Sequence, residues 1–179
     1  MSQPKHDNPA IQNLFDRRSF RSYTAEAVAD EDVKTVVLAG EWAASGSGKQ
    51  SPRFVVVTKP ETRETLRKMN AAVMGQPDAD PYYGAPCIVL VFADAGRSTG
   101  FEDACLALGN MMNAAAALGL GSCWIHREKE MFQTPEGREL MAKWGLGAEF
   151  YGVGACILGH PAAPAGEPPA RKADYAVWD

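Results

Sequence analysis

Apolar side chains recur at helical spacing near the start of the chain. Ile11, Leu14 and Phe15 fall on one helical face behind Asn8–Pro9, a capping side chain followed by proline in the first turn, so a helix is predicted here. A second helix carries an apolar stripe, with Asp30 placed as its N-cap. The same reasoning predicts helices over 30–42, 61–74, 101–118 and 135–144.

Short runs of β-branched and other apolar residues between the helices predict strands. These are Phe54–Val57, Cys87–Phe92, Ser122–Ile125 and Phe150–Leu158. The second run contains no polar residue and is typical of a strand that is buried on both faces. Helices alternate with these strands, which favours an α+β or α/β fold with helices packed on one sheet.

Two segments carry surface that a single chain is poorly able to bury. Residues 101–118 are rich in Ala, Met and Leu and nearly free of charge after Asp103, so this helix is expected to be buried, either centrally or at a subunit interface. The segment from about 160 to 179 is rich in proline and reads as an extended tail that cannot bury itself. A partner subunit is a reasonable surface for it, since segment exchange is a low-cost route to dimers.

Composition limits the classes of function. A chain of 179 residues, 46% hydrophobic and 22% charged, has the size and make-up of one soluble globular domain, so a single domain over 1–179 is expected. The formal net charge of −4 argues against non-specific nucleic-acid binding. No apolar run reaches the length of a membrane span, and the polar segment Met1–Pro9 lacks the apolar core of a signal peptide. We therefore expect a cytoplasmic protein with neither a nucleic acid nor a membrane as partner.

The four cysteines are Cys87, Cys105, Cys123 and Cys156, and no two of them stand at CxxC spacing. A structural zinc site needs clustered ligands, which this spacing does not supply, so no metal site is assigned. Reduced and mostly buried thiols are expected, with a catalytic or redox cysteine as the less favoured alternative.

The first candidate for chemistry directly follows the first helix. Arg17, Arg18, Ser19 and Arg21 offer three guanidiniums and one hydroxyl within five residues, a set of donors that suits a phosphate. The alternative is a solvated basic helix end, which the helix dipole also favours.

The loop from Ser45 to Pro52 is the second candidate. Its glycines, Gly48 among them, let backbone amides approach a ligand closely, and Gln50 offers both a donor and an acceptor to the edge of a planar heterocycle. The loop is not a phosphate-binding P-loop, because Lys49 is followed by Gln50 instead of Ser or Thr. A plain connection between a helix and a strand is the alternative.

Residues 118–126 join the charge-poor helix to a strand and form the third candidate. Their glycines let a flat ligand lie against the backbone, and amides from Cys123 to His126 would then face its edge. Core packing of Trp124 and an ordinary surface position for His126 are the alternatives, and the GxG spacing alone is weak. Arg171 in the tail is a fourth candidate, against a flexible cationic terminus.

Taken in order, these pieces resemble the FMN-dependent nitroreductase family. The matching segments are Asn13-Leu-Phe-Asp-Arg-Arg-Ser-Phe-Arg21, Ala44-Ser-Gly-Ser-Gly-Lys-Gln-Ser-Pro-Arg-Phe54, Ala115-Ala-Ala-Leu-Gly-Leu-Gly-Ser-Cys-Trp-Ile125 and Ile157-Leu-Gly-His-Pro161. The match runs roughly from Asn8 to Arg171, and the combination is specific where no single piece is.

The resemblance implies an α+β three-layer sandwich with a central, mostly antiparallel sheet, in an intertwined homodimer that binds two FMN molecules at its interface. In the family, the first arginine and the serine of Arg-Arg-Ser-x-Arg bind the FMN phosphate. The other arginines, and one from the tail, reach the phosphate or the ribityl and ring region. The loop glutamine contacts the flavin, and backbone amides of the strand after Gly-Leu-Gly lie near its reactive nitrogen. The cofactor-binding residues implied here are Arg17, Arg18, Ser19, Arg21, Gly48, Lys49, Gln50, Ser51, Cys123, Trp124, Ile125, His126 and Arg171.

The central loop departs from the family pattern. Many relatives carry Asn-x-Gln-Pro-Trp where this chain has Gly48-Lys-Gln-Ser-Pro52, and the connection 75–84 leaves little room for a lid. A more open or differently shaped pocket follows as a hypothesis.

The implied activity is FMN-dependent oxidation of NADH or NADPH with a ping-pong transfer to a small-molecule acceptor such as a nitroaromatic or a quinone. No side-chain acid or base is required, so no catalytic residue is assigned. Lys49 is the candidate cation for the pyrimidine edge of the flavin. Two alternatives stay open: a flavin-binding or sensor protein that does not turn over nicotinamide, and a specialised member that oxidises a dedicated substrate or fragments flavin.

Overall fold

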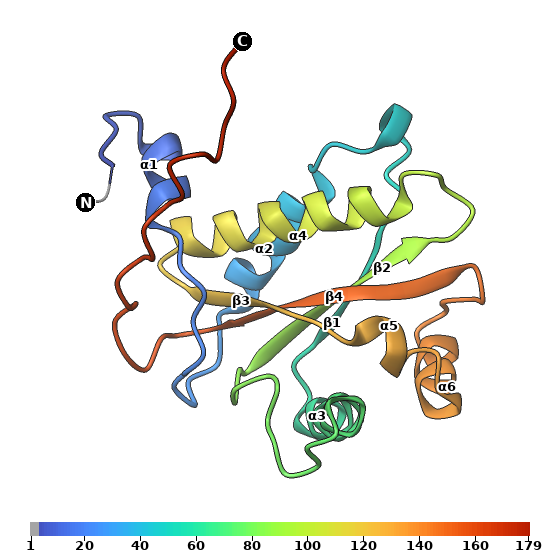
Figure 1. The fold of residues 1–179 in the computed structure, drawn as a ribbon. Coiled ribbons are helices and arrows are strands. Elements are labelled where there is room, and N and C mark those ends of the chain that lie inside the picture. The colour runs from blue at the N-terminus through green and yellow to red at the C-terminus, as the bar shows by residue number, and fades with distance from the viewer. Residues whose placement is uncertain (1–3) are drawn as a thin grey trace.

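The computed structural model describes residues 4–179 (Figure 1). Its helices are α1 (Pro9–Asp16), α2 (Asp30–Glu41), α3 (Pro60–Met74), α4 (Gly100–Ala117), α5 (Glu128–Met131) and α6 (Pro135–Lys143). Its strands are β1 (Arg53–Val57), β2 (Cys87–Asp94), β3 (Gly121–Ile125) and β4 (Phe150–Gly159), and a 3-10 turn, η1, spans Gly46–Gly48. Every helix and strand expected from the sequence is present, and α5 and η1 are additional.

The four strands form one sheet in the order β1-β2-β4-β3. Every neighbouring pair is antiparallel, so the expected mostly antiparallel sheet is confirmed. Strands β2 and β4 lie in the centre, whereas β1 and β3 are the two edges. This order separates the segment before β1 from the segment around β3.

Helices cover both faces of the sheet, which confirms the three-layer arrangement (Figure 1). On one face, Val36 of α2 and Leu108 of α4 pack against Val89 of β2 in one core cluster. On the other face, Leu66 of α3 joins Leu90 of β2 in a second cluster, to which α5 and α6 also contribute. Strand β2 is therefore buried on both faces, as its unbroken apolar run predicts.

The predicted start of α1 is confirmed, because Asn8 Oδ1 accepts a hydrogen bond from the N–H of Ala10 at 2.9 Å. The start of α2 differs from the prediction by one position. Ala29 is the N-cap and makes no side-chain cap bond, while Asp30 is the first helical residue. As one of three acids in the first turn, Asp30 interacts favourably with the helix dipole in place of capping.

Helix α4 is buried on only one side within this chain. Leu108 and Met111 face the core, whereas Phe101 and Leu106 are each about half exposed, at 52% and 51%. Complete burial of α4 in the centre of one chain is therefore not observed, and its burial at a subunit interface stays a prediction.

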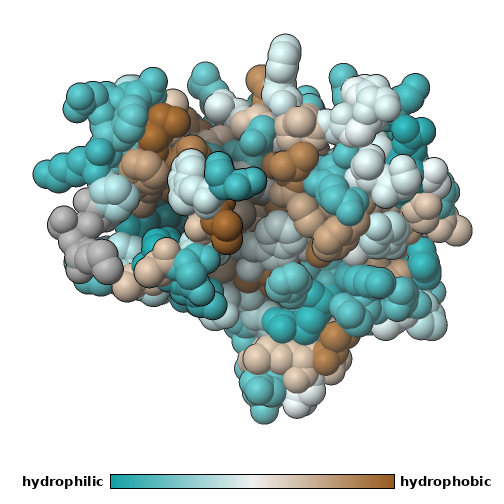
Figure 2. All heavy atoms as spheres, turned by 45° about the horizontal axis from the view of Figure 1, so that its top comes forward, coloured by the Kyte–Doolittle hydropathy of each residue, from teal (hydrophilic) through white to brown (hydrophobic). Residues whose placement is uncertain are grey.

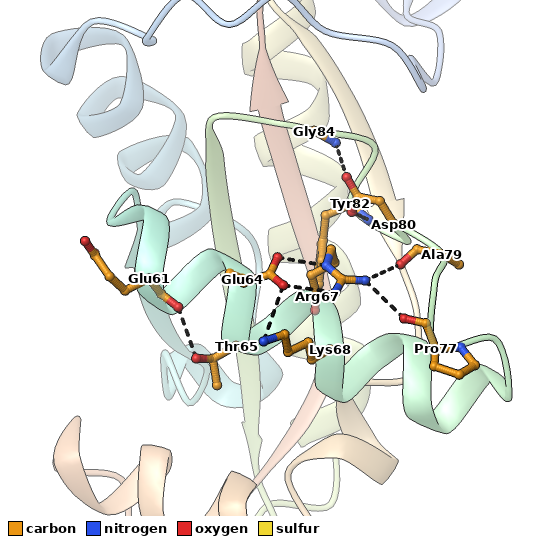
Figure 3. Close-up of polar contacts among 10 residues, drawn as sticks. All are labelled: Glu61, Glu64, Thr65, Arg67, Lys68, Pro77, Ala79, Asp80, Tyr82 and Gly84. Atoms are coloured by element: carbon orange, nitrogen blue, oxygen red, sulfur yellow. Dashed lines mark hydrogen bonds and ion pairs between the residues drawn. The ribbon is translucent and has the colours of Figure 1, made fainter.

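The connection 75–84 is clamped onto α3 (Figure 3). The Arg67 guanidinium donates to the carbonyls of Pro77 and Ala79 and pairs with the Glu64 carboxylate at 2.8 Å. The Asp80 carboxylate accepts from the backbone N–H of Tyr82. This clamp holds Tyr82 in the interior, where it is 2% exposed.

The chain beyond β4 has no further helix or strand up to residue 179, and Pro161 forms an isolated antiparallel bridge with Tyr23. Within residues 4–179, no helix has both the length and the apolar character needed to cross a membrane. All four cysteines are free thiols, and three of them are buried as expected. Burial raises the pKa of the Cys87 thiol to about 12, which makes it a poor nucleophile.

Candidate functional site

The arginine segment lies beside the start of β3. Ser19 forms a parallel bridge with Ser122, and the N–H of Phe20 donates to the Ser122 carbonyl at 2.9 Å. Helix α1 is fixed nearby, because the Asn13 side chain donates to the carbonyl of Asn113 at 2.9 Å. Two of the segments singled out in the sequence, 17–21 and 118–126, are thus brought together.

The three guanidiniums of this segment are not equivalent. Arg18 Nη1 donates to the carbonyls of Phe15 at 2.6 Å and Arg17 at 2.8 Å, so its charge is already engaged with the end of α1. Arg17 and Arg21 form no salt bridge with any acid in residues 4–179, and Ser19 is exposed. Two guanidiniums and one hydroxyl therefore remain for an anionic ligand.

Strand β3 offers one free backbone edge next to these groups. In an antiparallel strand the N–H and C=O of one residue point to the same side, and the sides alternate along the strand. The Ser122 carbonyl points outward to Phe20. The backbone N–H and C=O groups of Cys123 and Ile125 therefore point inward to β4, and those of Trp124 point outward. Of the amides expected to face a ligand, that of Trp124 is the one this alternation leaves on the open edge.

The side chains of β3 serve the core. Cys123 and Ile125 are buried in the cluster beneath α3, and Trp124 packs on the α4 side. Gly154 makes room for the indole, since a Cβ there would lie 2.6 Å from Trp124 Nε1. His126 is exposed, and its ring centroid lies 5.7 Å from that of Trp124. The Trp124 side chain thus packs in the core and the His126 side chain lies at the surface, while the backbone of this strand stays available to a ligand.

The loop 45–52 is shaped by a buried carboxylate. Asp103 in the first turn of α4 accepts from the N–H of Gly46 at 2.8 Å and from the Ser51 hydroxyl at 2.7 Å. Although burial opposes it, these bonds and one from Thr99 hold the pKa of Asp103 below its usual range. Ser51 is consequently turned inward and is 7% exposed, so it is an anchor of the loop.

The tip of the same loop is presented to solvent. Gly48, Lys49 and Gln50 are exposed, and Gln50 adopts a positive φ of 50° that is uncommon for a residue with a side chain. Its backbone N–H donates a hydrogen bond to the Ser45 hydroxyl oxygen at 2.9 Å, which supports this conformation. The Lys49 and Gln50 side chains are therefore free to meet a ligand or a second protein.

Within one chain, the loop and the arginine segment do not meet. The loop precedes β1 and is tied to Asp103, whereas the arginine segment lies at β3 and is tied to Asn113. Three strand spacings separate the two edges, about 14 Å, and ten residues of helix separate the two anchors, about 15 Å. Figure 1 shows η1 and α1 at opposite ends of α4.

Arg171 lies in the exposed tail. Its Nη1 donates to the Pro169 carbonyl at 3.1 Å, a local contact between two neighbouring tail residues. The structure does not join it to the arginine segment.

Asp103 is a site residue that the sequence marks only as the last charge before an apolar stretch. An acid in the first turn of an otherwise apolar helix, next to Glu102, was the available signal, because a buried carboxylate requires donors. A buried polar group formed by Asn70, Tyr82 and Glu128, near the end of β3, gave no comparable signal, since its members are far apart in sequence.

The donor set fits a cofactor that has a phosphate at one end and a flat heterocycle at the other. Arg17, Arg21 and Ser19 suit the phosphate, and the open edge at Trp124 suits the donors and acceptors of the heterocycle. Among residues 4–179, no cluster of three His, Cys, Asp or Glu side chains is arranged to hold a metal ion.

Comparison with known proteins agrees with this fit. The model of the Nitroreductase family matches residues 14–83 and 74–130. A Bacillus subtilis (strain 168) protein named FMN reductase, NAD(P)H, is 29% identical over 177 residues, covering 87% of this chain and 67% of its own length. This chain thus spans about two thirds of the length of that relative.

Solved structures share the fold over nearly the whole chain. A Desulfovibrio desulfuricans protein in complex with FMN is 30% identical with a TM-score of 0.74, covering 97% of this chain and 98% of its own. A nitroreductase with bound FMN from Bacteroides fragilis reaches a TM-score of 0.87 at 24% identity, covering 96% of this chain and 100% of its own. At that identity the second match shows the fold alone.

Proposed function

This chain belongs to the nitroreductase family, and we propose that it is an FMN-dependent oxidoreductase that takes electrons from NADH or NADPH. The proposal draws on the relative named for FMN reduction with NAD(P)H and on the related protein solved with FMN. Nitroaromatics and quinones are the proposed acceptors, and a cytoplasmic location is part of the same proposal.

One observation carries the proposal: the segment with Arg17, Ser19 and Arg21 lies against Ser122 at the start of β3, two residues before Trp124, whose amide the alternation leaves on the open edge. In this assignment Arg17, Arg21 and Ser19 hold the FMN phosphate, and Arg18 holds the segment in place through its bonds to Phe15 and Arg17. When bound, FMN supplies the redox chemistry by accepting a hydride from NAD(P)H and passing electrons to the acceptor.

The remaining work of the chain is positioning and charge. The Trp124 backbone orients the edge of the heterocycle, and the packing of its indole against Gly154 keeps that backbone fixed. Lys49 supplies a positive charge, which favours an electron-rich heterocycle. No side chain is assigned as a general acid or base.

A homodimer with FMN at its interface completes the site. The exposed loop tip of Lys49 and Gln50 is too far from the Trp124 edge to serve it within one chain, so a second copy is proposed to supply it. Figure 2 shows hydrophobic side chains exposed among polar ones on the face that it views. Leu14 of α1 and Leu106 of α4 are each about half exposed. An exposed apolar face of this kind is typical of an interaction surface, and the extended tail is proposed to lie on the partner as well.

The test is an absorption spectrum of the purified protein, followed by titration of the colourless protein with FMN. The proposal expects a yellow protein, or one that FMN restores, which then oxidises NADH or NADPH in the presence of a quinone. A protein that FMN cannot reconstitute would refute it. A protein that binds FMN but consumes no nicotinamide would instead favour the flavin-binding alternative.

A further inference from the structure

A cleft of about 610 Å³ opens where β3 ends, and His126 forms part of its lining. The charged part of the lining carries three cations, Arg127, Lys129 and Arg138, against one acid, Glu130. The apolar part is aromatic and includes Phe101, Phe150 and Tyr151. A flat ligand with an anionic group matches this combination of rings and positive charge.

One guanidinium of this lining, that of Arg127, is held in a fixed position. Arg127 adopts a φ of 85°, a left-handed conformation that residues with a side chain rarely adopt. Its Nε donates to Asn70 Oδ1 at 2.6 Å, while Asn70 Nδ2 donates to the carbonyl of His126 at 2.9 Å. Asn70 is fully buried in α3, so one carboxamide fixes both the backbone before Arg127 and its side chain.

The positive charge of Arg127 is not neutralised by the chain. Within residues 4–179, the guanidinium makes no salt bridge with a carboxylate. The nearest acid in sequence is Glu128, which is completely buried and whose Oε1 accepts from the Tyr82 hydroxyl at 3.1 Å. Burial raises the pKa of Glu128 well above its usual range, against the opposing effect of the nearby Arg127 charge, so burial disfavours a charged carboxylate beside Arg127.

The buried group has a support of its own. Tyr82 contacts both Asn70, with 3.3 Å between the hydroxyl and Nδ2, and Glu128. The clamp between Arg67 and the 75–84 connection keeps Tyr82 in that position (Figure 3). The orientation of Arg127 therefore depends on α3 and on the connection that follows it.

We infer that this cleft binds an anionic group of the substrate, a carboxylate or a phosphate, and that Arg127 is the residue that selects for it. Asn70 acts as a positioning residue through its bond to Arg127 Nε. Lys129 and Arg138 add to the attraction, and the aromatic lining accepts the flat part of the molecule. The inference rests on the proposed function, since it names the substrate class that the same site favours. Either the acceptor, through a carboxylate, or the nicotinamide nucleotide, through a phosphate, presents this chemistry.

The test compares matched substrates in the FMN-loaded protein. One arm measures kcat/KM for 4-nitrobenzoate against 4-nitrobenzyl alcohol, and the other measures kcat/KM for NADPH against NADH. The variants are Arg127→Gln, the charge-retaining Arg127→Lys, and Lys143→Gln as an exposed cation outside the cleft. A non-catalytic readout is the calorimetric binding of benzoate against benzyl alcohol to the resting protein.

Arg127→Gln is expected to lower the preference for the anionic partner by about tenfold in one arm, because one charge-assisted contact is lost. Loss in the acceptor arm assigns the carboxylate, and loss in the nucleotide arm assigns the phosphate. Arg127→Lys is expected to keep most of the preference, and Lys143→Gln all of it.

An unchanged preference in both arms for Arg127→Gln would overturn the inference, as would an equal loss in Lys143→Gln. Failure of the proposed function has a different signature, namely a wild-type protein with no NAD(P)H oxidation at all. In that case the binding of benzoate still tests whether the cleft binds an anionic group. The inference is supported if benzoate binds more tightly than benzyl alcohol and Arg127→Gln removes this difference. It is overturned if the two bind equally.

Discussion

Replacing Asp103 with alanine removes the side chain that ties the loop 45–52 to α4. Its carboxylate accepts from the Gly46 N–H at 2.8 Å, the Ser51 hydroxyl at 2.7 Å and the Thr99 hydroxyl at 3.3 Å. The substitution leaves the buried Ser51 hydroxyl without its acceptor. The loop tip, with Lys49 and Gln50, is then no longer held in place.

The expected loss of stability follows from these bonds. A hydrogen bond to a charged group contributes about 1.5–3 kcal/mol, and the two short bonds to Asp103 dominate. Asp103→Ala is therefore expected to lower the free energy of unfolding by about 3–5 kcal/mol. Asp103→Asn keeps one acceptor oxygen and is expected to lose about 1–2 kcal/mol.

Urea unfolding followed by tryptophan fluorescence measures these losses, and hydrogen exchange of the Gly46 amide reports on the loop itself. The lowered pKa of Asp103 also predicts how stability depends on pH. The stabilising effect of Asp103 is present above its ordinary pKa of 3.8 and is lost as the pH falls through the lowered pKa. Asp103→Asn removes that acid-side dependence. A loss below about 1 kcal/mol in Asp103→Ala, with Gly46 still protected, would refute the anchoring role.

Three further predictions concern the cofactor, the buried acid and a packed glycine. Arg17→Ala is expected to weaken FMN binding by about tenfold or more, measured by flavin titration, because it removes a charge-assisted contact; unchanged affinity would exclude Arg17 from the phosphate site. Glu128 has a raised pKa, so its contribution is complete below about 4.5 and declines as the pH rises, by up to about 1.4 kcal/mol per unit. Glu128→Gln is expected to remove this decline in urea unfolding at pH 5 and pH 7, and an identical slope would contradict the prediction. Gly152→Ala is expected to destabilise by about 1–3 kcal/mol, since its Cβ would lie 2.5 Å from the Glu128 carbonyl oxygen, whereas Gly109→Ala, with nothing within 4 Å, is expected not to destabilise; equal melting temperatures for the two variants would contradict this.

The elements of the fold were readable from the sequence where a pattern repeats. The apolar run of β2 and the capped start of α1 are local signals, and both are confirmed. Helix α5 has only four residues, too few for any periodicity to show. The exact first residue of α2 could not be predicted from the sequence either, because acids are favourable both as caps and in the first turn.

The site was only partly readable, for a topological reason. The sequence identified the arginine segment and the strand after Gly121, and the structure places them side by side. It did not indicate that the loop with Lys49 would lie at the other edge of the sheet, because strand order is not a local property. The cleft near Arg127 was missed for the same reason, since its lining comes from four separate parts of the chain and from a left-handed conformation at a non-glycine residue.

The central claim is that each FMN site takes its arginines from one chain and its loop tip from the other. It is tested by refolding together an Arg17→Glu chain and a Lys49→Glu/Gln50→Glu chain, each unable to bind FMN alone, and counting bound FMN. Random pairing makes half of the dimers mixed, and each mixed dimer holds one unaltered site, so about a quarter of the wild-type FMN is expected to return. If no FMN returns although mixed dimers form, both sets of residues act within one chain and the claim is wrong.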